Sequence, residues 1–402
     1  MILKAMIWRR ACSGALVLSL AGCAAEDSSG TDHVDELPRL AAAEELRIGS
    51  LDDPDMGFTR IGAVAVDPDD NVYVLEREER EIRVYDAQGS LVRRIGRQGS
   101  GPGEFETPTA FGMIGDTLWA NDIRNRRITL FTRAGELITS FTTSPIPIET
   151  IPGMSVMLTA SGLAKDGTLT SGWMVAMTRD PPTDTIMIPL VSMDTTGAIL
   201  DTVRHVTLAF PQRGTIMAGN REIPLPSTPS AGPLDYAGPD GSMFALERPL
   251  AGNAQEGVFT VTRIDPAGDT VYRLSYRYRP RVYDDTVVSG IIRPHAATYA
   301  ERTGTEADVL EAQLRQALVL PPFQPGIAAL KAGQGGSLWL RTADDGAPLA
   351  HWIILNPDGS ARGVVDLPRR ATLHWIDGDV SWAAVPDDVD VPWLVRYRVT
   401  RM

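Results

Sequence analysis

The chain has 402 residues, of which 43% are hydrophobic and 22% are charged, and its formal net charge is −13. This composition is typical of a folded chain with a large core, so it excludes intrinsic disorder and a polytopic membrane protein. The acidic balance also excludes nucleic acid as an expected partner, because phosphate binding needs a basic surface.

A basic segment, an apolar run and a cysteine follow one another in the first 23 residues. The basic segment holds Lys4, Arg9 and Arg10, and the apolar run over residues 11–21 is too short to cross a bilayer. The run closes on four residues that resemble the bacterial lipobox: Leu20, Ala21, Gly22 and Cys23. The resemblance implies cleavage of residues 1–22 as a lipoprotein signal peptide and lipidation of Cys23. The alternative is a buried helix followed by a chance cysteine.

Lipidation would make the membrane a partner through acyl chains. Loss of residues 1–22 changes the formal net charge from −13 to −16, so the protein surface itself should be repelled by anionic lipid. Residues 23–44 are polar and are expected to form the lipidated tether. Ala24, rather than Asp, follows the cysteine, which in lipoproteins argues for the periplasmic side of the outer membrane if the cell has two membranes.

An internal repeat organises the rest of the chain. Residues 61–96 and 110–141 each run strand, polar turn, strand, charged loop, strand, glycine turn, strand. The glycine turns at Gly89 and Gly135 are spaced at the 40 to 50 residue period of a four-stranded propeller blade. Similar units follow, and they begin near residues 163, 236, 328 and 371.

These units predict an all-β, six-bladed β-propeller of four-stranded blades over residues 45–402. The last unit supplies about three strands, and residues 45–50 form a spare strand before the first blade. We therefore expect an N-terminal strand to close the last blade, which removes a sheet edge. A β-sandwich, or two β domains divided near residue 205, is the alternative.

Long insertions fall in the connections between blades and between the second and third strands of blades. In a propeller these connections share one face, which is commonly the binding face. The longest insertion, at about residues 281–327, contains one short predicted helix over residues 307–320, preceded by a capping box at residues 303–306. Its single apolar stripe should lie on the propeller face or on a partner, or form a lid over the channel.

The connection from Arg97 to Pro108, with the sequence RQGSGPGEFETP, and the strands after it resemble the NHL repeat. The matching elements are a Gly-Pro-Gly-x-Phe linker, Asn121-Asp122, Asn125-Arg126-Arg127-Ile128 and Phe131 with Gly135. The resemblance implies a six-bladed propeller, in a family that includes interaction modules and enzymes.

The catalytic signatures of such enzymes are weak in this chain. NHL-type lyases hold zinc with several channel histidines, whereas the five histidines here do not recur at one position in two blades. Lactonase-type propellers bind calcium through channel Asn, Asp and Glu, and Asn is scarce here. We expect no metal, catalytic residue or cofactor, although calcium and zinc are not excluded.

The ends of the second strands point to a ligand site at the insertion face. Together they form a mixed ring of charge with aromatic support, suited to a polar ligand or a protein loop. The alternative is a set of mutual ion pairs that closes the channel mouth. The candidate binding residues are Glu76, Arg77, Asp122, Arg124, Trp173, Glu247, Arg248, Arg341 and Asp344.

The sequence therefore favours a membrane-anchored, extracytoplasmic binding or scaffolding propeller for a protein or polar ligand, without catalysis. The alternative class is a metal-dependent propeller hydrolase or lyase, of the lactonase or NHL-lyase type. A third hypothesis is a structural plug in a larger envelope complex.

Overall fold

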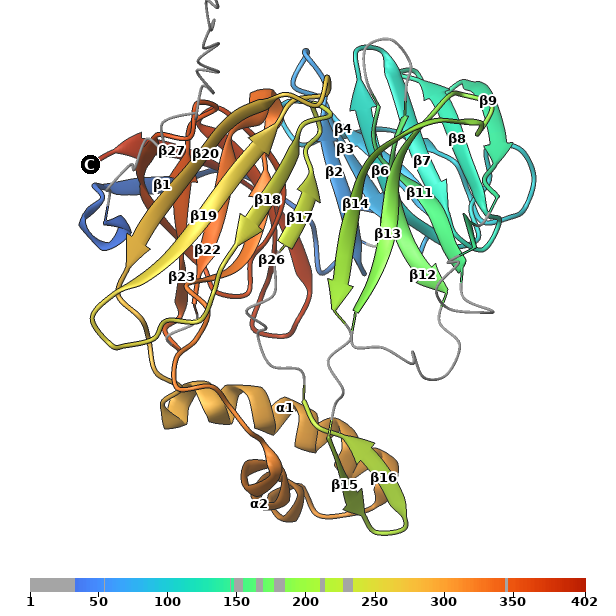
Figure 1. The fold of residues 1–402 in the computed structure, drawn as a ribbon. Coiled ribbons are helices and arrows are strands. Elements are labelled where there is room, and N and C mark those ends of the chain that lie inside the picture. The colour runs from blue at the N-terminus through green and yellow to red at the C-terminus, as the bar shows by residue number, and fades with distance from the viewer. Residues whose placement is uncertain are drawn as a thin grey trace, which may run out of the picture.

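Six antiparallel blades surround a central channel, so the protein is an all-β, six-bladed propeller (Figure 1). The computed structural model describes residues 33–402 except 54, 145, 148–154, 164–168, 177–184, 210–213, 227–233 and 344–345. The predicted fold class is confirmed, and the β-sandwich and two-domain alternatives are wrong. The expected signal peptide, lipobox and Cys23 lie outside the described residues.

The first two blades follow the predicted repeat. Each is a four-stranded meander whose innermost strand is the first in sequence. Blade 1 consists of β2 (Ile61–Val66), β3 (Val72–Glu76), β4 (Glu81–Tyr85) and β5 (Leu91–Ile95). Blade 2 consists of β6 (Pro108–Ile114), β7 (Thr117–Asp122), β8 (Arg127–Thr132) and β9 (Leu137–Thr142).

Blades 3 and 4 contain longer strands. Blade 3 has an added two-residue strand, and its strands are β10 (Ile146–Pro147), β11 (Ser155–Leu163), β12 (Leu169–Ala176), β13 (Thr185–Met193) and β14 (Ile199–Ala209). Blade 4 consists of β17 (Leu234–Ala237), β18 (Met243–Glu247), β19 (Gly257–Ile264) and β20 (Thr270–Tyr278).

The N-terminal strand closes the ring at the last blade, as predicted. Blade 5 consists of β21 (Ile327–Ala332), β22 (Leu338–Thr342), β23 (Leu349–Leu355) and β24 (Ala361–Pro368), and a 3-10 turn, Gln334–Gly336, links its first two strands. Blade 6 consists of β25 (Thr372–Asp377), β26 (Val380–Pro386), β27 (Pro392–Arg401) and β1 (Arg39–Ile48).

The closing strand β1 pairs with the last strand, β27, and links blades 5 and 6. β1 pairs antiparallel with β27 from Leu40 opposite Arg401 to Ile48 opposite Leu394, and it also pairs in parallel with β24. It begins at Arg39, after a 3-10 turn at Val34–Glu36, so the end of the expected tether is already part of the propeller. This pairing covers the outer edge of blade 5.

Apolar side chains between neighbouring blades form the core. Between blades 1 and 2, Phe105 of the Gly-Pro-Gly-x-Phe linker is fully buried and stacks edge-on against Phe131, with ring centroids 6.0 Å apart. Gly96 permits this packing, because a Cβ there would lie 2.3 Å from the Phe105 ring. The linker thereby fixes the first two blades against each other.

Two insertions pack together outside the propeller, and we call them the insertion cap (Figure 1). One is the hairpin of β15 (Thr215–Ala218) and β16 (Arg221–Pro224) between blades 3 and 4. The other is the helix pair α1 (Asp285–Thr303) and α2 (Ala307–Ala317) between blades 4 and 5. Both leave from the same end of the blades, as the propeller topology requires.

The helical insertion differs from the prediction in two ways. It contains a second helix, α1, which has Pro294 inside it and no regular apolar period. The predicted capping box is wrong, because α2 has Glu306 at its N-cap without a side-chain cap bond, and Thr303 Oγ1 donates to Tyr299 O in the last turn of α1. The buried stripe of α2, Leu310 and Leu314, packs on α1 and the hairpin.

Candidate ligand site in the central channel

Two of the predicted ligand residues hold loops together. Glu76 accepts hydrogen bonds from the backbone N–H groups of Thr59 (3.1 Å) and Arg60 (2.9 Å), and it is fully buried. Burial raises the pKa of Glu76, against the opposing effect of these N–H donors. The carboxylate therefore anchors the segment that enters blade 1.

Asp122 has the same role at the equivalent position of blade 2. It accepts from the backbone N–H groups of Glu106 (2.6 Å), Thr107 (3.2 Å) and Asn125 (3.0 Å), and it is 2% exposed. The recurrence of an acid at the end of the second strand thus reflects a repeated loop anchor. The sequence predicts both acids as members of a mixed charged ring that binds a ligand, whereas the structure uses them within the fold.

The other predicted residues are spread over the insertion face. Their described contacts tie several of them to their own or the next blade. Glu247 pairs with Arg273 at 2.6 Å, Arg248 is buried and donates to Ile327 O at 2.7 Å, and Arg341 donates to Arg369 O at 3.3 Å. Burial lowers the pKa of Arg248. Arg77 is half-buried against Gly62, Arg124 is exposed, Trp173 lies in β12, and Asp344 is outside the described residues.

A concave site lies in the channel itself. The cavity has a volume of about 880 Å³ and is walled by the first strands of all six blades: β2, β6, β11, β17, β21 and β25. It extends to the turns between first and second strands, at Pro68, Gly115 and Pro239. The two insertions of the cap lead into the starts of first strands, whereas these turns follow the ends of first strands. The cavity therefore reaches the face opposite the insertion cap.

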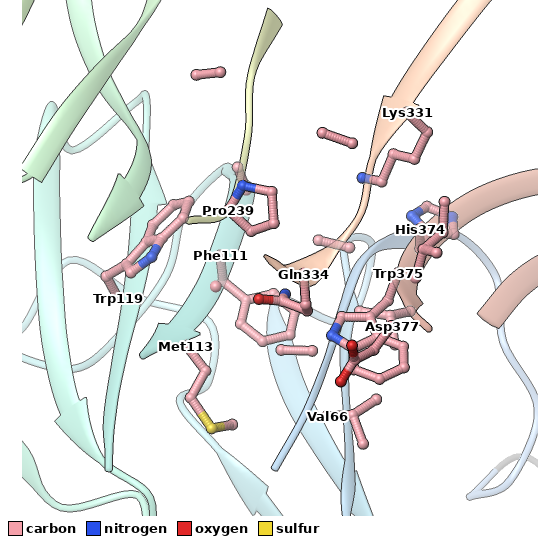
Figure 2. Close-up of a pocket in the computed structure, with 18 of the residues that line it drawn as sticks. Val66, Phe111, Met113, Trp119, Pro239, Lys331, Gln334, His374, Trp375 and Asp377 are labelled. Atoms are coloured by element: carbon pink, nitrogen blue, oxygen red, sulfur yellow. The ribbon is translucent and has the colours of Figure 1, made fainter. Parts of the chain in front are cut away.

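Aromatic side chains form two sides of this cavity (Figure 2). Phe111 of β6 and Trp119 of β7 lie on one side, and Trp375 of β25 lies on the other. Trp119 belongs to a second strand and reaches the channel because its register partner on β6 is Gly112. A Cβ at Gly112 would lie 2.7 Å from Trp119 Cζ2, so any other residue would displace the indole.

A cation, Lys331, also lines the cavity. The side chain of Lys331, on β21, extends into the cavity, and its Nζ lies 5.9 Å from the ring centroid of Tyr236 (Figure 2). This is a cation–π contact. Among the residues that the structure describes, no carboxylate lies within ion-pair distance of Lys331 Nζ.

His374, on the neighbouring strand β25, is the second polar group in this part of the channel. Its Nε2 atom is enclosed and has no hydrogen-bond partner among the described residues. Burial, reinforced by the nearby Lys331 cation, lowers the pKa of His374 to about 3. The imidazole is therefore neutral at neutral pH and can donate or accept one hydrogen bond at Nε2.

Gln334 and Asp377 add polar groups toward the hairpin turns (Figure 2). Sequence reasoning missed the channel residues because they do not recur from blade to blade. One signal was available: Lys331 is one of three lysines, with Lys4 and Lys165, and the remaining 35 of the 38 basic residues are arginines. A lysine on a first strand is thus an unusual choice for this chain.

The fold and the channel site together define a six-bladed β-propeller with a cavity at its centre. Residues 55–136, which include blades 1 and 2, match a family described as a 6-bladed beta-propeller (DUF5128). No curated protein matches the chain by sequence.

The solved structures that the chain resembles are distant in sequence. A protein from Bacteroides fragilis is 14% identical, with 92% of this chain and 99% of that chain covered and a TM-score of 0.48. A member of the DUF4221 family from Bacteroides vulgatus is 10% identical, with 90% and 99% covered and a TM-score of 0.48. Virginiamycin B lyase from Staphylococcus aureus, in complex with quinupristin, is 15% identical, with 83% and 80% covered and a TM-score of 0.35.

The described part of the chain shows no three-residue metal cluster and no membrane-spanning helix. Within it, no group of three His, Cys, Asp or Glu side chains is placed to hold a metal ion. Within the same residues, neither helix is long and apolar enough to cross a membrane.

Proposed function

We propose that this protein is a lipid-anchored, extracytoplasmic binding propeller that holds a small organic molecule in its central channel. The observation that carries the proposal is the cavity of about 880 Å³, with aromatic sides and the polar heads of Lys331 and His374 inside it. Apolar walls with a few convergent polar groups, in a volume of roughly 300–1,000 Å³, are typical of small-molecule sites.

The channel supports this function better than the insertion face does. At the insertion face, Glu76 and Asp122 direct their carboxylates at loop backbone, so these groups are occupied within the fold. In the channel, His374 Nε2 has no described partner, and leaving such a group unpaired costs about 1–3 kcal/mol. A bound molecule would recover that free energy if the imidazole turned to present Nε2 to the cavity.

The anchor in this proposal is Cys23, supported by the lipobox-like sequence before it. With a formal charge of −16 after cleavage, the protein would need acyl chains to stay on an anionic membrane, at about 0.8 kcal/mol per buried methylene. Periplasmic attachment to the outer membrane belongs to the same proposal.

A fragment screen on the full chain, purified into lipid nanodiscs, tests the channel site. Binding is measured by ligand-observed NMR, with empty nanodiscs as the control for partition into lipid. We expect fragments that bind the wild type to lose about tenfold or more in affinity in Trp119→Ala, which removes one aromatic wall. Arg124→Ala, at the insertion face, should leave the affinity unchanged.

If Arg124→Ala lost affinity and Trp119→Ala kept it, the ligand would bind at the insertion face and the proposal would be wrong. The proposal would also be wrong if the wild-type protein bound no fragment of any charge. Circular dichroism of each variant shows whether the propeller is intact, so that a loss of binding is not mistaken for unfolding.

A further inference from the structure

We infer that the channel ligand is an organic monoanion with a flat apolar body, of the carboxylate class, and that Lys331 and His374 hold its charged group. This inference rests on the proposed function and specifies the chemistry of the same site. It follows from a partly exposed cation that lines the channel, an adjacent imidazole whose Nε2 has no described partner, and aromatic side chains in the cavity walls.

Lys331 is the cation of the channel site. It lines the channel and is partly exposed there. A cation in such a concave site attracts an anionic group. Its described contact is the face of Tyr236, and such contacts contribute only about 0.5–2 kcal/mol. The chain carries 51 acidic residues, yet none of those described lies within ion-pair distance of Lys331 Nζ. A ligand anion would supply that missing partner.

His374 supplies the second contact. The low pKa keeps its ring neutral, so it adds no further positive charge to the site. His374 Nε2 is covered in this structure, so the ring must turn before it donates one hydrogen bond to a ligand, whereas the Lys331 ammonium supplies charge and up to three donors. A carboxylate has two oxygens and can accept from both groups at once.

The walls define the rest of the ligand. Phe111 and Trp119 face the channel from blade 2, and Trp375 faces it from blade 6, next to His374 (Figure 2). Aromatic rings on both sides of a cavity favour a flat apolar group, which can stack or make edge-on contacts. The charged group and the flat body therefore belong to one molecule.

The acidic side chains of the cavity disfavour a ligand with more than one negative charge. Asp67, Asp70 and Asp377 line the cavity near the hairpin turns, and the protein as a whole is strongly acidic. One cation inside an acidic rim matches a monoanion and repels a polyanion such as a nucleoside diphosphate.

A matched pair of probes tests the inference: 4-fluorophenylacetate and its neutral analogue 4-fluorophenylacetamide. Their affinities are measured by ¹⁹F NMR relaxation with the full chain in phosphatidylcholine nanodiscs and with empty nanodiscs as the control. We expect the carboxylate to bind about tenfold more tightly than the amide, as charge-assisted hydrogen bonds provide. Bound carboxylate should also slow the acetylation of Lys331 by acetic anhydride, measured by peptide mass spectrometry, and the amide should not.

Variants assign the preference to Lys331. Lys331→Met should reduce the affinity ratio of the two probes to about one, whereas Lys331→Arg should retain most of it because the charge remains. Arg293→Met, in the insertion cap, removes a cation outside the channel and should leave the ratio unchanged.

The failures of the two proposals are distinguishable. Equal affinity for both probes in the wild type, or a folded Lys331→Met protein that still prefers the carboxylate, overturns the anion inference and leaves the channel as a ligand site. If neither probe binds or protects Lys331, the anion inference is wrong, and the fragment screen with Trp119→Ala then decides whether the channel binds anything.

Discussion

Trp119 lies directly opposite Gly112 in the antiparallel pair of β6 and β7, and its indole occupies the space that a side chain at position 112 would fill. A glycine on the innermost strand therefore determines which ring lines the channel. The relationship links one backbone position to both packing and the candidate site.

Gly112→Ala should displace the Trp119 ring, because the new Cβ would lie 2.7 Å from Cζ2. We expect a loss of about 1–3 kcal/mol in the free energy of unfolding, as for overpacked sites, and a change in near-ultraviolet circular dichroism. Gly252→Ala is the matched control, because no atom lies within 4 Å of the added Cβ. An equal effect of both substitutions would argue against the steric explanation.

Phe105→Ala should cost about 3–5 kcal/mol in the free energy of unfolding, since it empties a fully buried aromatic site between blades 1 and 2. Urea denaturation followed by circular dichroism measures it. Leu137→Ala, at a side chain that is 44% exposed, should change stability by less than about 0.5 kcal/mol. A small effect at Phe105 would mean that the linker does not hold the two blades together.

Asp122→Ala tests whether this residue is a loop anchor or a ligand group. Several buried N–H donors would lose their acceptor, so we expect a loss of about 2–4 kcal/mol in the free energy of unfolding. Channel probes should bind the folded variant with unchanged affinity. If Asp122→Ala kept wild-type stability but lost probe binding, Asp122 would be a ligand-binding residue, as the sequence predicts.

His374 should make the fold sensitive to acid. Its pKa is about 3 in the folded protein and near 6.5 in the unfolded chain, so between these values the unfolded chain binds more protons. Its contribution to stability is therefore complete above pH 6.5 and is lost as the pH falls toward 3.

Thermal unfolding of His374→Gln from pH 7 to pH 4 measures this contribution. The variant should lose less stability over this range than the wild type. His205→Gln, at an exposed position of β14, serves as the control. Identical pH profiles for wild type and His374→Gln would show that His374 is not held neutral by the fold.

Cys23→Ser should abolish labelling of the protein by a clickable fatty acid in cells, because the thiol is the expected acceptor of the lipid. Cys12→Ser changes the other cysteine, which lies in the expected signal peptide, and should leave labelling of the mature protein intact. Retained label in Cys23→Ser would contradict the lipid anchor.

Short-range chemistry made the propeller predictable. The hairpin turns place glycines where the backbone needs positive φ, at Gly89, Gly135 and Gly359 among others, and their spacing reports the blade period. The three-strand last unit and a spare N-terminal strand together predicted the closure that β1 makes with β27. The helix α1 was missed because Pro294 interrupts its pattern and its buried residues are matched to the hairpin of another insertion.

The amino-acid sequence by itself determined the number of blades, the closure and the common side of the insertions, because these depend on local turns and on a repeat. The tertiary structure alone decided the site. Each blade contributes a different residue to the channel, such as Lys331 from blade 5 and His374 from blade 6, so no repeat or local pattern could reveal them. Only closure of the ring brings the Lys331 cation, a neutral imidazole and aromatic rings from separate blades into one cavity.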